Sequence, residues 1–154
     1  MKKLNLILLL IIGLYSCGTN NGVEELDLDE FIDTWHRNAA LADFDAYFNL
    51  MSDDFHFLGT APKENWNKSD FADFSKPYFD KGKGWDFAAS NRKWYGNKAN
   101  GIVWFDEDLD TWMQGCRGSG VMKKVNGEWK IAYYNLTVLI ENNKIQEFIA
   151  LRKR

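Results

Sequence analysis

Residue types that commonly build reactive sites are scarce in this chain, whose 154 residues include only two histidines and two cysteines. The histidines, His36 and His56, are expected on separate elements and show no HxxxH spacing, and there is no CxxC pair. The sequence therefore predicts no metal site, and we expect no cofactor. If Cys17 is modified, as argued below, Cys116 has no partner for a disulfide. It is then expected as a small packed residue in a domain held together by its core.

No apolar run is long enough to span a bilayer, which requires roughly 20 residues, since the longest (residues 4–14) has only about 11. This run follows Lys2 and Lys3, and it has the proportions of a signal-peptide core. The next segment, Leu-Tyr-Ser-Cys-Gly at 14–18, resembles a bacterial lipoprotein cleavage box. That resemblance implies that Cys17 is lipidated and becomes the first mature residue. The alternative is an ordinary secretory signal with a coincidental cysteine.

The same resemblance predicts how the chain is divided and where it is located. We expect a signal peptide (1–16), the lipidated cysteine and a tether (17–26), one folded α+β domain (27–145) and a basic C-terminal tail (146–154). A lipoprotein of this kind belongs to the Gram-negative cell envelope, with the membrane as its partner through the lipid. The absence of Asp after the lipidated cysteine favours the outer membrane, facing the periplasm or the cell surface.

Basic residues are too few for a nucleic-acid-binding protein. The chain has 19 basic and 22 acidic residues, and removal of residues 1–16 leaves 17 basic residues, a net charge of about −5. Aromatic residues, by contrast, make up 16% of the chain and include seven Trp. Such residues either fill a core or line a pocket for flat or apolar ligands.

The first part of the domain has the pattern of a helix. Asp27 can act as N-cap, with Glu30 completing a capping box. Trp35 is expected in the core or on a pocket floor, whereas His36 is expected on the surface. The apolar stripe that predicts the helix consists of Leu28, Phe31, Ile32, Trp35, Ala39 and Ala42.

Two shorter helices and a strand are predicted next. A helix is expected over 45–51, and another begins with Ser69 as its cap and is kinked or ended by Pro77. Between them, residues 54–59 read as a strand whose alternation places His56 on the face opposite its two Phe neighbours.

Long strands dominate the rest of the chain, at 101–112, 117–125 and 129–140. Asn126-Gly127 is a strong hairpin signal because both residues tolerate positive φ. The order of elements predicts a curved antiparallel sheet covered on one face by about three N-terminal helices, which together enclose a pocket.

Several segments together resemble the SnoaL-like branch of the nuclear-transport-factor-2-like superfamily. The resemblance covers roughly residues 29–140 and implies a cone-shaped α+β fold with an internal pocket and a homodimer formed through the outer sheet face. Functions differ widely across the superfamily, so the fold does not assign the activity. The segments that carry the resemblance are 53–60, 64–66, 103–107, 117–121 and 127–132.

Counting by two along the strands assigns a set of side chains to the cavity. Asp106 is the candidate general base, because an apolar pocket raises the pKa of a carboxyl group, and His56 or Tyr133 would stabilise an enolate. Many relatives carry His in the last strand, where this chain has residues that do not titrate near neutral pH. The candidate ligand-binding residues are Trp35, Trp66, Trp104, Arg117 and Asn135.

A purely structural interpretation stays open, in which Asp106 and Arg117 form an ion pair between neighbouring strands and the aromatic residues only pack. The sequence is therefore compatible with three functions. The first is a lipid-anchored protein that binds a small apolar or aromatic ligand in its cone. The second is an isomerase-like or cyclase-like enzyme with Asp106 as base, and the third is a dimeric interaction domain.

Overall fold

The computed structural model describes residues 27–152, so the predicted signal peptide and lipidation site lie outside the described residues. Helix α1 (Leu28–Ala40) begins where the sequence predicts, because the Asp27 side chain accepts a hydrogen bond of 2.9 Å from the backbone N–H of Asp29. Its buried face includes Ile32 and Trp35. Helix α2 (Phe44–Asn49) follows closely.

Helix α3 (Lys68–Phe79) starts slightly earlier than predicted, because Asn67 rather than Ser69 is its N-cap. The Asn67 side chain accepts a hydrogen bond of 2.9 Å from the N–H of Asp70. Pro77 lies in the last turn, and the helix ends two residues after it. A fourth helix, α4 (Ile145–Arg152), lies in the segment predicted as a tail and buries none of its residues. No helix in the described range has both the length and the apolar character needed to cross a bilayer.

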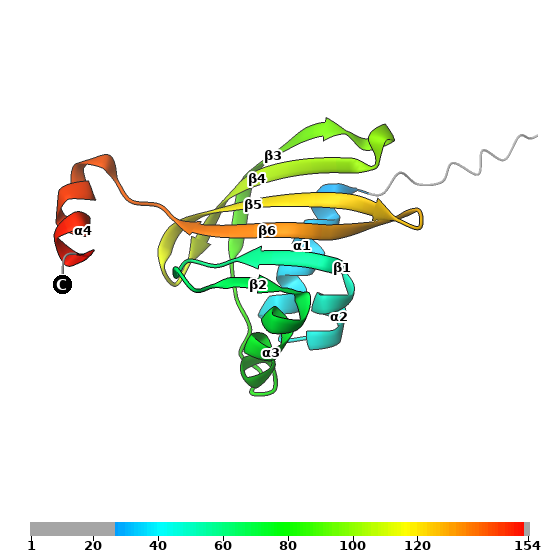
Figure 1. The fold of residues 1–154 in the computed structure, drawn as a ribbon, viewed down its shortest axis with the longest axis horizontal. Helices are drawn as coiled ribbons and strands as arrows, with labels where there is room; N and C mark the ends of the chain where they lie inside the picture. Colours follow the sequence, from blue (N-terminus) through cyan, green and yellow to red (C-terminus); the bar gives the residue numbers. More distant parts are fainter. Residues whose placement is uncertain (1–26, 153–154) are drawn as a thin grey trace, which may run out of the picture.

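One curved sheet forms the rest of the domain (Figure 1). Its strands lie in the order β2-β1-β6-β5-β4-β3. All neighbouring pairs are antiparallel except β1 and β6, which run parallel. The predicted antiparallel sheet is therefore wrong at this one pair. After β1 and β2 the chain crosses through α3 to β3 at the opposite edge of the sheet, and β6 then returns to β1 in the parallel direction. The strands are β1 (Met51–Leu58), β2 (Asn65–Asn67), β3 (Ala88–Asn97), β4 (Ile102–Thr111), β5 (Gln114–Val125) and β6 (Glu128–Val138).

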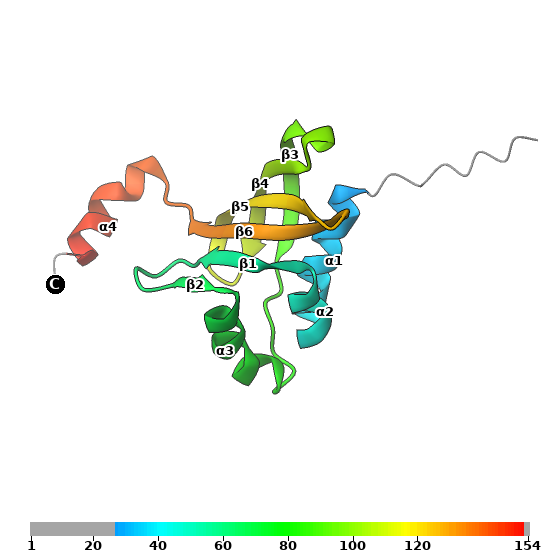
Figure 2. The ribbon, with the colours of Figure 1, turned by 45° about the vertical axis from the view of Figure 1, so that its right-hand side comes forward.

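Helices α1, α2 and α3 cover one face of the sheet, and the sheet curls around them without closing (Figures 1 and 2). The predicted α+β class and curved sheet are confirmed. The core lies between these two layers, with Trp35, Phe55 and Tyr134 among its most buried side chains. Helix α4 stands apart, beyond the end of β6 (Figure 2).

Two local features of the last hairpin matter for the site. Asn126 and Gly127 have φ values of 53° and 89°, so the predicted turn is confirmed. The register between β5 and β6 shifts where Val121 pairs with Tyr133 and Met122 pairs with Ile131, which leaves Ala132 as an extra residue in β6. Such a bulge reverses the faces of all residues that follow it.

Candidate functional site

An aromatic pocket lies between the helices and the concave face of the sheet. Its cavity volume is about 120 Å³. Helix α1 supplies Trp35, which stacks on Tyr47 of α2 with ring centroids 5.0 Å apart, and strand β6 supplies Tyr134. The aromatic residues that line the pocket are Trp35, Tyr47, Phe57, Trp66, Phe71, Phe74, Trp85, Phe87, Trp112 and Tyr134.

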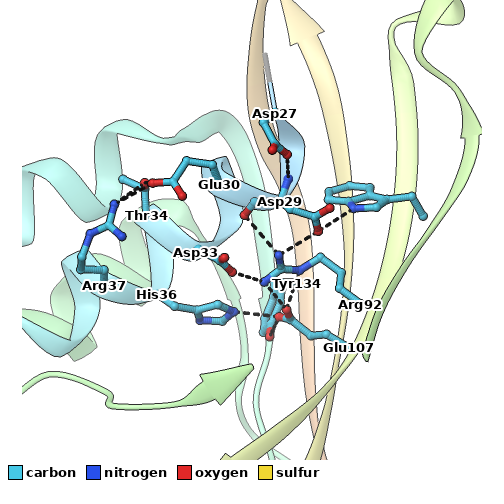
Figure 3. Close-up of polar contacts among 11 residues, drawn as sticks. Asp27, Asp29, Glu30, Asp33, Thr34, His36, Arg37, Arg92, Glu107 and Tyr134 are labelled. Atoms are coloured by element: carbon cyan, nitrogen blue, oxygen red, sulfur yellow. Dashed lines mark hydrogen bonds and ion pairs between the residues drawn. The ribbon is translucent and has the colours of Figure 1, made fainter. Parts of the chain in front are cut away.

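A polar group borders this apolar pocket and is centred on Glu107, whose side chain is fully buried (Figure 3). Its Oε1 atom accepts hydrogen bonds from His36 Nε2 and from the Tyr134 hydroxyl, each of 2.7 Å. A carboxylate can only accept, so Nε2 carries the proton in this contact. His36 and Tyr134 themselves line the pocket, and they connect its wall to the buried carboxylate.

Arg92 binds the other carboxylate oxygen of Glu107 (Figure 3). Its Nε atom donates to Glu107 Oε2 at 2.8 Å, and its terminal nitrogens bind Asp29 at 3.0 Å and Asp33 at 2.7 Å. The Arg92 side chain is only 7% exposed, so this guanidinium is buried among three carboxylates. Trp94 Nε1 adds a hydrogen bond of 2.9 Å to Asp29. The group thus joins α1 to β3 and β4.

The pKa values of these side chains follow from burial and charge. Burial by itself raises the pKa of Glu107, but the hydrogen bonds from His36 and Tyr134 and the positive charge of Arg92 act in the opposite direction, so the pKa lies below its ordinary value. Burial and the adjacent Glu107 raise the pKa of Tyr134 well above its ordinary value. Glu107 is therefore ionised at neutral pH, and Tyr134 remains a hydrogen-bond donor.

Two of the predicted site residues, Trp35 and Trp66, line the pocket. The other six lie on the opposite, outer face of the sheet, so the pocket position predicted for them is wrong. Along β4, the core side carries Val103, Phe105 and Glu107, which leaves Trp104 (51% exposed) and Asp106 outside. The outer-face residues are His56, Trp104, Asp106, Arg117, Tyr133 and Asn135.

On β6, the β-bulge explains the error. Counting by two from Trp129 and Ile131 leads to Tyr133, but the extra residue places Tyr134 on the inner face instead. On β4, the prediction assigned Asp106 to the cavity, whereas the buried face of the strand carries Glu107.

The outer-face residues make contacts of their own. Asp106 accepts a hydrogen bond of 2.9 Å from the Tyr95 hydroxyl, which raises the pKa of Tyr95. Arg117 lies 3.6 Å from Asp108, so the expected ion pair between Asp106 and Arg117 is replaced by one with its direct cross-strand partner. The ring of His56 contacts Asn65 on β2.

The predictions missed the buried polar group. His36 was expected on the surface but is only 8% exposed. It follows Ile32 by four residues and precedes Ala39 by three, so helical spacing could have placed it on the buried stripe. No comparable signal marks Arg92, because its three partners lie on other elements. Within residues 27–152, no three His, Cys, Asp or Glu side chains converge as metal ligands.

Comparison with known proteins agrees with this architecture. The family model of the SnoaL-like domain matches residues 28–141. No curated protein matches the chain.

Solved structures with the same fold are distant in sequence. A protein of unknown function from Pseudomonas putida, described as NTF2-like, has a TM-score of 0.62 at 9% identity and covers 76% of this chain and 87% of its own. An NTF2-like protein from Cytophaga hutchinsonii has a TM-score of 0.60 at 15% identity, covering 73% and 95%. A provisionally assigned scytalone dehydratase from Novosphingobium aromaticivorans has a TM-score of 0.58 at 10% identity, covering 73% and 82%. At these identities the similarity shows the fold alone.

Proposed function

The chain belongs to the SnoaL-like domain family, and we propose that its pocket binds a small apolar or aromatic molecule about the size of a single ring. The observation that carries this proposal is the aromatic lining around a cavity of about 120 Å³. An engineered apolar cavity of about 150 Å³ in another protein takes up benzene, so the volume suits a ligand of this size. Aromatic walls favour such a ligand through apolar contact and ring packing.

Polar groups at the wall of the pocket can fix the orientation of a bound ligand. The imidazole of His36 and the hydroxyl of Tyr134 are held in place by the ionised Glu107, so both have fixed directions before a ligand arrives. Preorganised polar groups in an apolar pocket select one orientation of a ligand at little entropic cost.

Two neighbouring residues of β6 allow a matched test, because they point to opposite faces of the sheet. Leu136 lines the pocket and Thr137 is exposed on the outer face. We expect toluene to bind to the wild-type protein and to Thr137→Trp, but not to Leu136→Trp, whose added ring fills the cavity. Titration calorimetry measures this, with circular dichroism to verify folding. Equal binding by both variants, or no binding by the wild-type protein, would contradict the proposal.

A second candidate function, proton transfer on a small ligand, rests on His36. Because Nε2 donates to Glu107, a neutral His36 keeps an unprotonated Nδ1, which makes no hydrogen bond within the described residues. An imidazole held by a carboxylate next to a ligand pocket can serve as a general base. In this pocket, His36 fits that role better than Asp106, which lies on the outer face.

Deuterium exchange can test this second candidate. With acetophenone as a one-ring C–H acid in D₂O, NMR should show faster exchange of the methyl protons in the presence of the wild-type protein. The acceleration should be lost in His36→Gln and retained in Asp106→Asn. If only Asp106→Asn lost the acceleration of exchange, the outer face would be favoured as the reactive site. If the wild-type protein gave no acceleration, only the binding function would remain.

We further propose that the protein is anchored to the outer membrane through a lipid on Cys17, a proposal supported by the cleavage-box pattern at residues 14–18. Expression in a Gram-negative host with a clickable palmitate analogue should label the wild-type chain and leave Cys17→Ser unlabelled. Equal labelling of both chains, or an unlabelled wild-type chain recovered free in the periplasm, would refute the anchor.

A homodimer through the outer sheet face is proposed as well. Support comes from three exposed side chains on or beside this face, Tyr95, Trp104 and Ile102, which are 42%, 51% and 52% exposed. Light scattering should report a dimer that Trp104→Glu dissociates. Leu41→Glu is the control, because Leu41 is 72% exposed after α1 on the helical side. A monomeric wild-type protein would refute the proposal.

A further inference from the structure

One acidic side chain, Glu64, lies among the aromatic residues that line the pocket. It belongs to the loop between β1 and β2, which is closed by a hydrogen bond of 2.8 Å from the Gly59 N–H to the Glu64 carbonyl oxygen. The Glu64 Oε2 atom accepts a further hydrogen bond of 3.0 Å from the N–H of Ala61. The carboxylate is therefore held at the pocket by the backbone of its own loop.

The absence of a side chain at Gly59 allows this position. A Cβ atom at residue 59 would lie 2.3 Å from Glu64 Oε2 and 2.8 Å from Glu64 Cβ. Any other residue at this position would push the carboxylate away from its present place. The position of the Glu64 carboxylate at the pocket thus depends on a glycine at residue 59.

This carboxylate has no cationic partner in the described part of the chain, and neither Lys nor Arg lines the pocket. Its Oε1 atom likewise makes no hydrogen bond to the described residues. A carboxylate that loses its water without gaining a partner is strongly disfavoured. A neutral ligand that fills the pocket would impose this cost on Glu64, whereas a cationic ligand would compensate for it.

The aromatic residues that share the pocket lining with Glu64 suit a cation as well. Trp66, Trp85 and Trp112 all line the pocket, and Trp is the aromatic side chain with the strongest attraction for a cation over its ring face. Trp112 is 83% exposed, and its ring contacts no other aromatic ring among residues 27–152. Its ring faces are therefore available to a ligand that enters the pocket.

We propose that the ligand of this pocket carries a methylated ammonium group, which lies against the tryptophans beside Glu64. The inference rests on the proposed binding function and specifies the class of ligand. A primary ammonium is a poorer match, because its three N–H groups need three acceptors and the pocket lining is mostly aromatic, with Glu64 as its one carboxylate. A quaternary nitrogen presents only methyl groups, keeps its charge, and is similar in size to one ring. The positive charge of Arg92 does not repel such a ligand, because three carboxylates neutralise that guanidinium.

Choline and 3,3-dimethylbutan-1-ol allow a direct test, because they have the same shape and differ in a charged nitrogen or a neutral carbon. Titration calorimetry on the purified protein should show choline binding about tenfold more tightly than the alcohol, which corresponds to about 1.4 kcal/mol. Glu64→Gln should reduce this preference to about twofold or less. Glu128→Gln removes the same charge from the exposed start of β6 and should preserve the preference.

Gly59→Ala provides a second variant that keeps the charge but displaces the carboxylate, and it should also weaken choline binding relative to the alcohol. Equal affinities for the two compounds in the wild-type protein, or an unchanged preference in Glu64→Gln, would overturn the inference. Toluene separates this failure from that of the proposed function. If toluene binds and choline shows no preference, only the cation inference is lost, whereas if none of the three compounds binds, both are lost.

Discussion

Replacing Glu107 by Gln keeps the shape of the side chain and removes its charge at the centre of the buried polar group. The wild-type carboxylate accepts three hydrogen bonds, from His36, Tyr134 and Arg92. A neutral amide cannot accept all three, and its NH₂ group would face either Arg92 or His36 as a second donor. Removing one partner of a buried ion pair costs about 3–5 kcal/mol.

We expect a value near the lower end of that range, about 3 kcal/mol, because Arg92 keeps its contacts with Asp29 and Asp33. In a domain of this size such a loss lowers the unfolding midpoint by roughly 12 °C. Asp108→Asn is the matched control, since Asp108 lies next to Glu107 on β4 but is 48% exposed and pairs with Arg117 at 3.6 Å. An exposed pair of this kind contributes about 0.5 kcal/mol or less.

Urea unfolding followed by tryptophan fluorescence measures both variants, and pH adds a second criterion. The folded pKa of Glu107 is depressed below its ordinary value of 4.5, so its contribution to stability is complete above that pH and is lost as the pH falls through the folded pKa. The stability difference between the wild-type protein and Glu107→Gln should therefore be constant near neutral pH and shrink below about pH 4.5. A loss under 1 kcal/mol at pH 7, or a loss equal to that of the control, would refute this account of the buried group.

Three further predictions concern other parts of the molecule. Gly118→Ala should cost about 2 kcal/mol in urea unfolding, because its Cβ atom would lie 2.0 Å from the Tyr134 hydroxyl oxygen. Gly115→Ala on the same strand should be close to neutral, since its Cβ atom would meet no other atom within 4 Å, and equal effects would contradict the packing argument. Truncation after Glu141 should leave the midpoint of thermal unfolding within about 2 °C of the wild-type value, because α4 buries no residue, and a larger loss would reveal support from α4. Asp106→Asn should leave toluene affinity within about twofold of the wild-type value, since Asp106 lies on the outer face; a tenfold loss in calorimetry would show that this face influences the pocket.

Features governed by neighbouring residues were predictable from the sequence. The N-cap at Asp27 and the turn at Asn126-Gly127 each depend on a few consecutive side chains, and both are confirmed. The strands at 101–112 and 129–140 were recognisable because they are rich in aromatic and β-branched residues, and the strand between them because it leads into the Asn126-Gly127 turn. Trp35 and Trp66 were placed at the pocket correctly because the first lies on a regular helical stripe and the second follows a short loop.

The faces of the strands were harder to predict, because they depend on contacts between distant segments. Glu107 is a charged residue on a core face, and its burial is possible only because His36, 71 positions away, and Arg92, 15 positions away, both bind it. A pattern that weighs hydrophobicity alone therefore assigns this carboxylate to the outside. The bulge at Ala132 contains no glycine or proline that would mark it in the sequence. Because of this bulge, Tyr133 and Tyr134 lie on the faces opposite from those expected.

The parallel pairing of β1 with β6 has a consequence for the order in which the domain folds. Met51 pairs with Ile131, so β1 gains its central neighbour only after almost the whole domain has been synthesised. The hairpins from β3 to β6 involve partners close in sequence, and they can form early. Closing the long loop between β1 and β6 is the slower, entropically opposed event. The sheet against which the N-terminal helices pack is consequently completed late. In a chain that ends before β6, strand β1 has no partner on the side that faces the middle of the sheet.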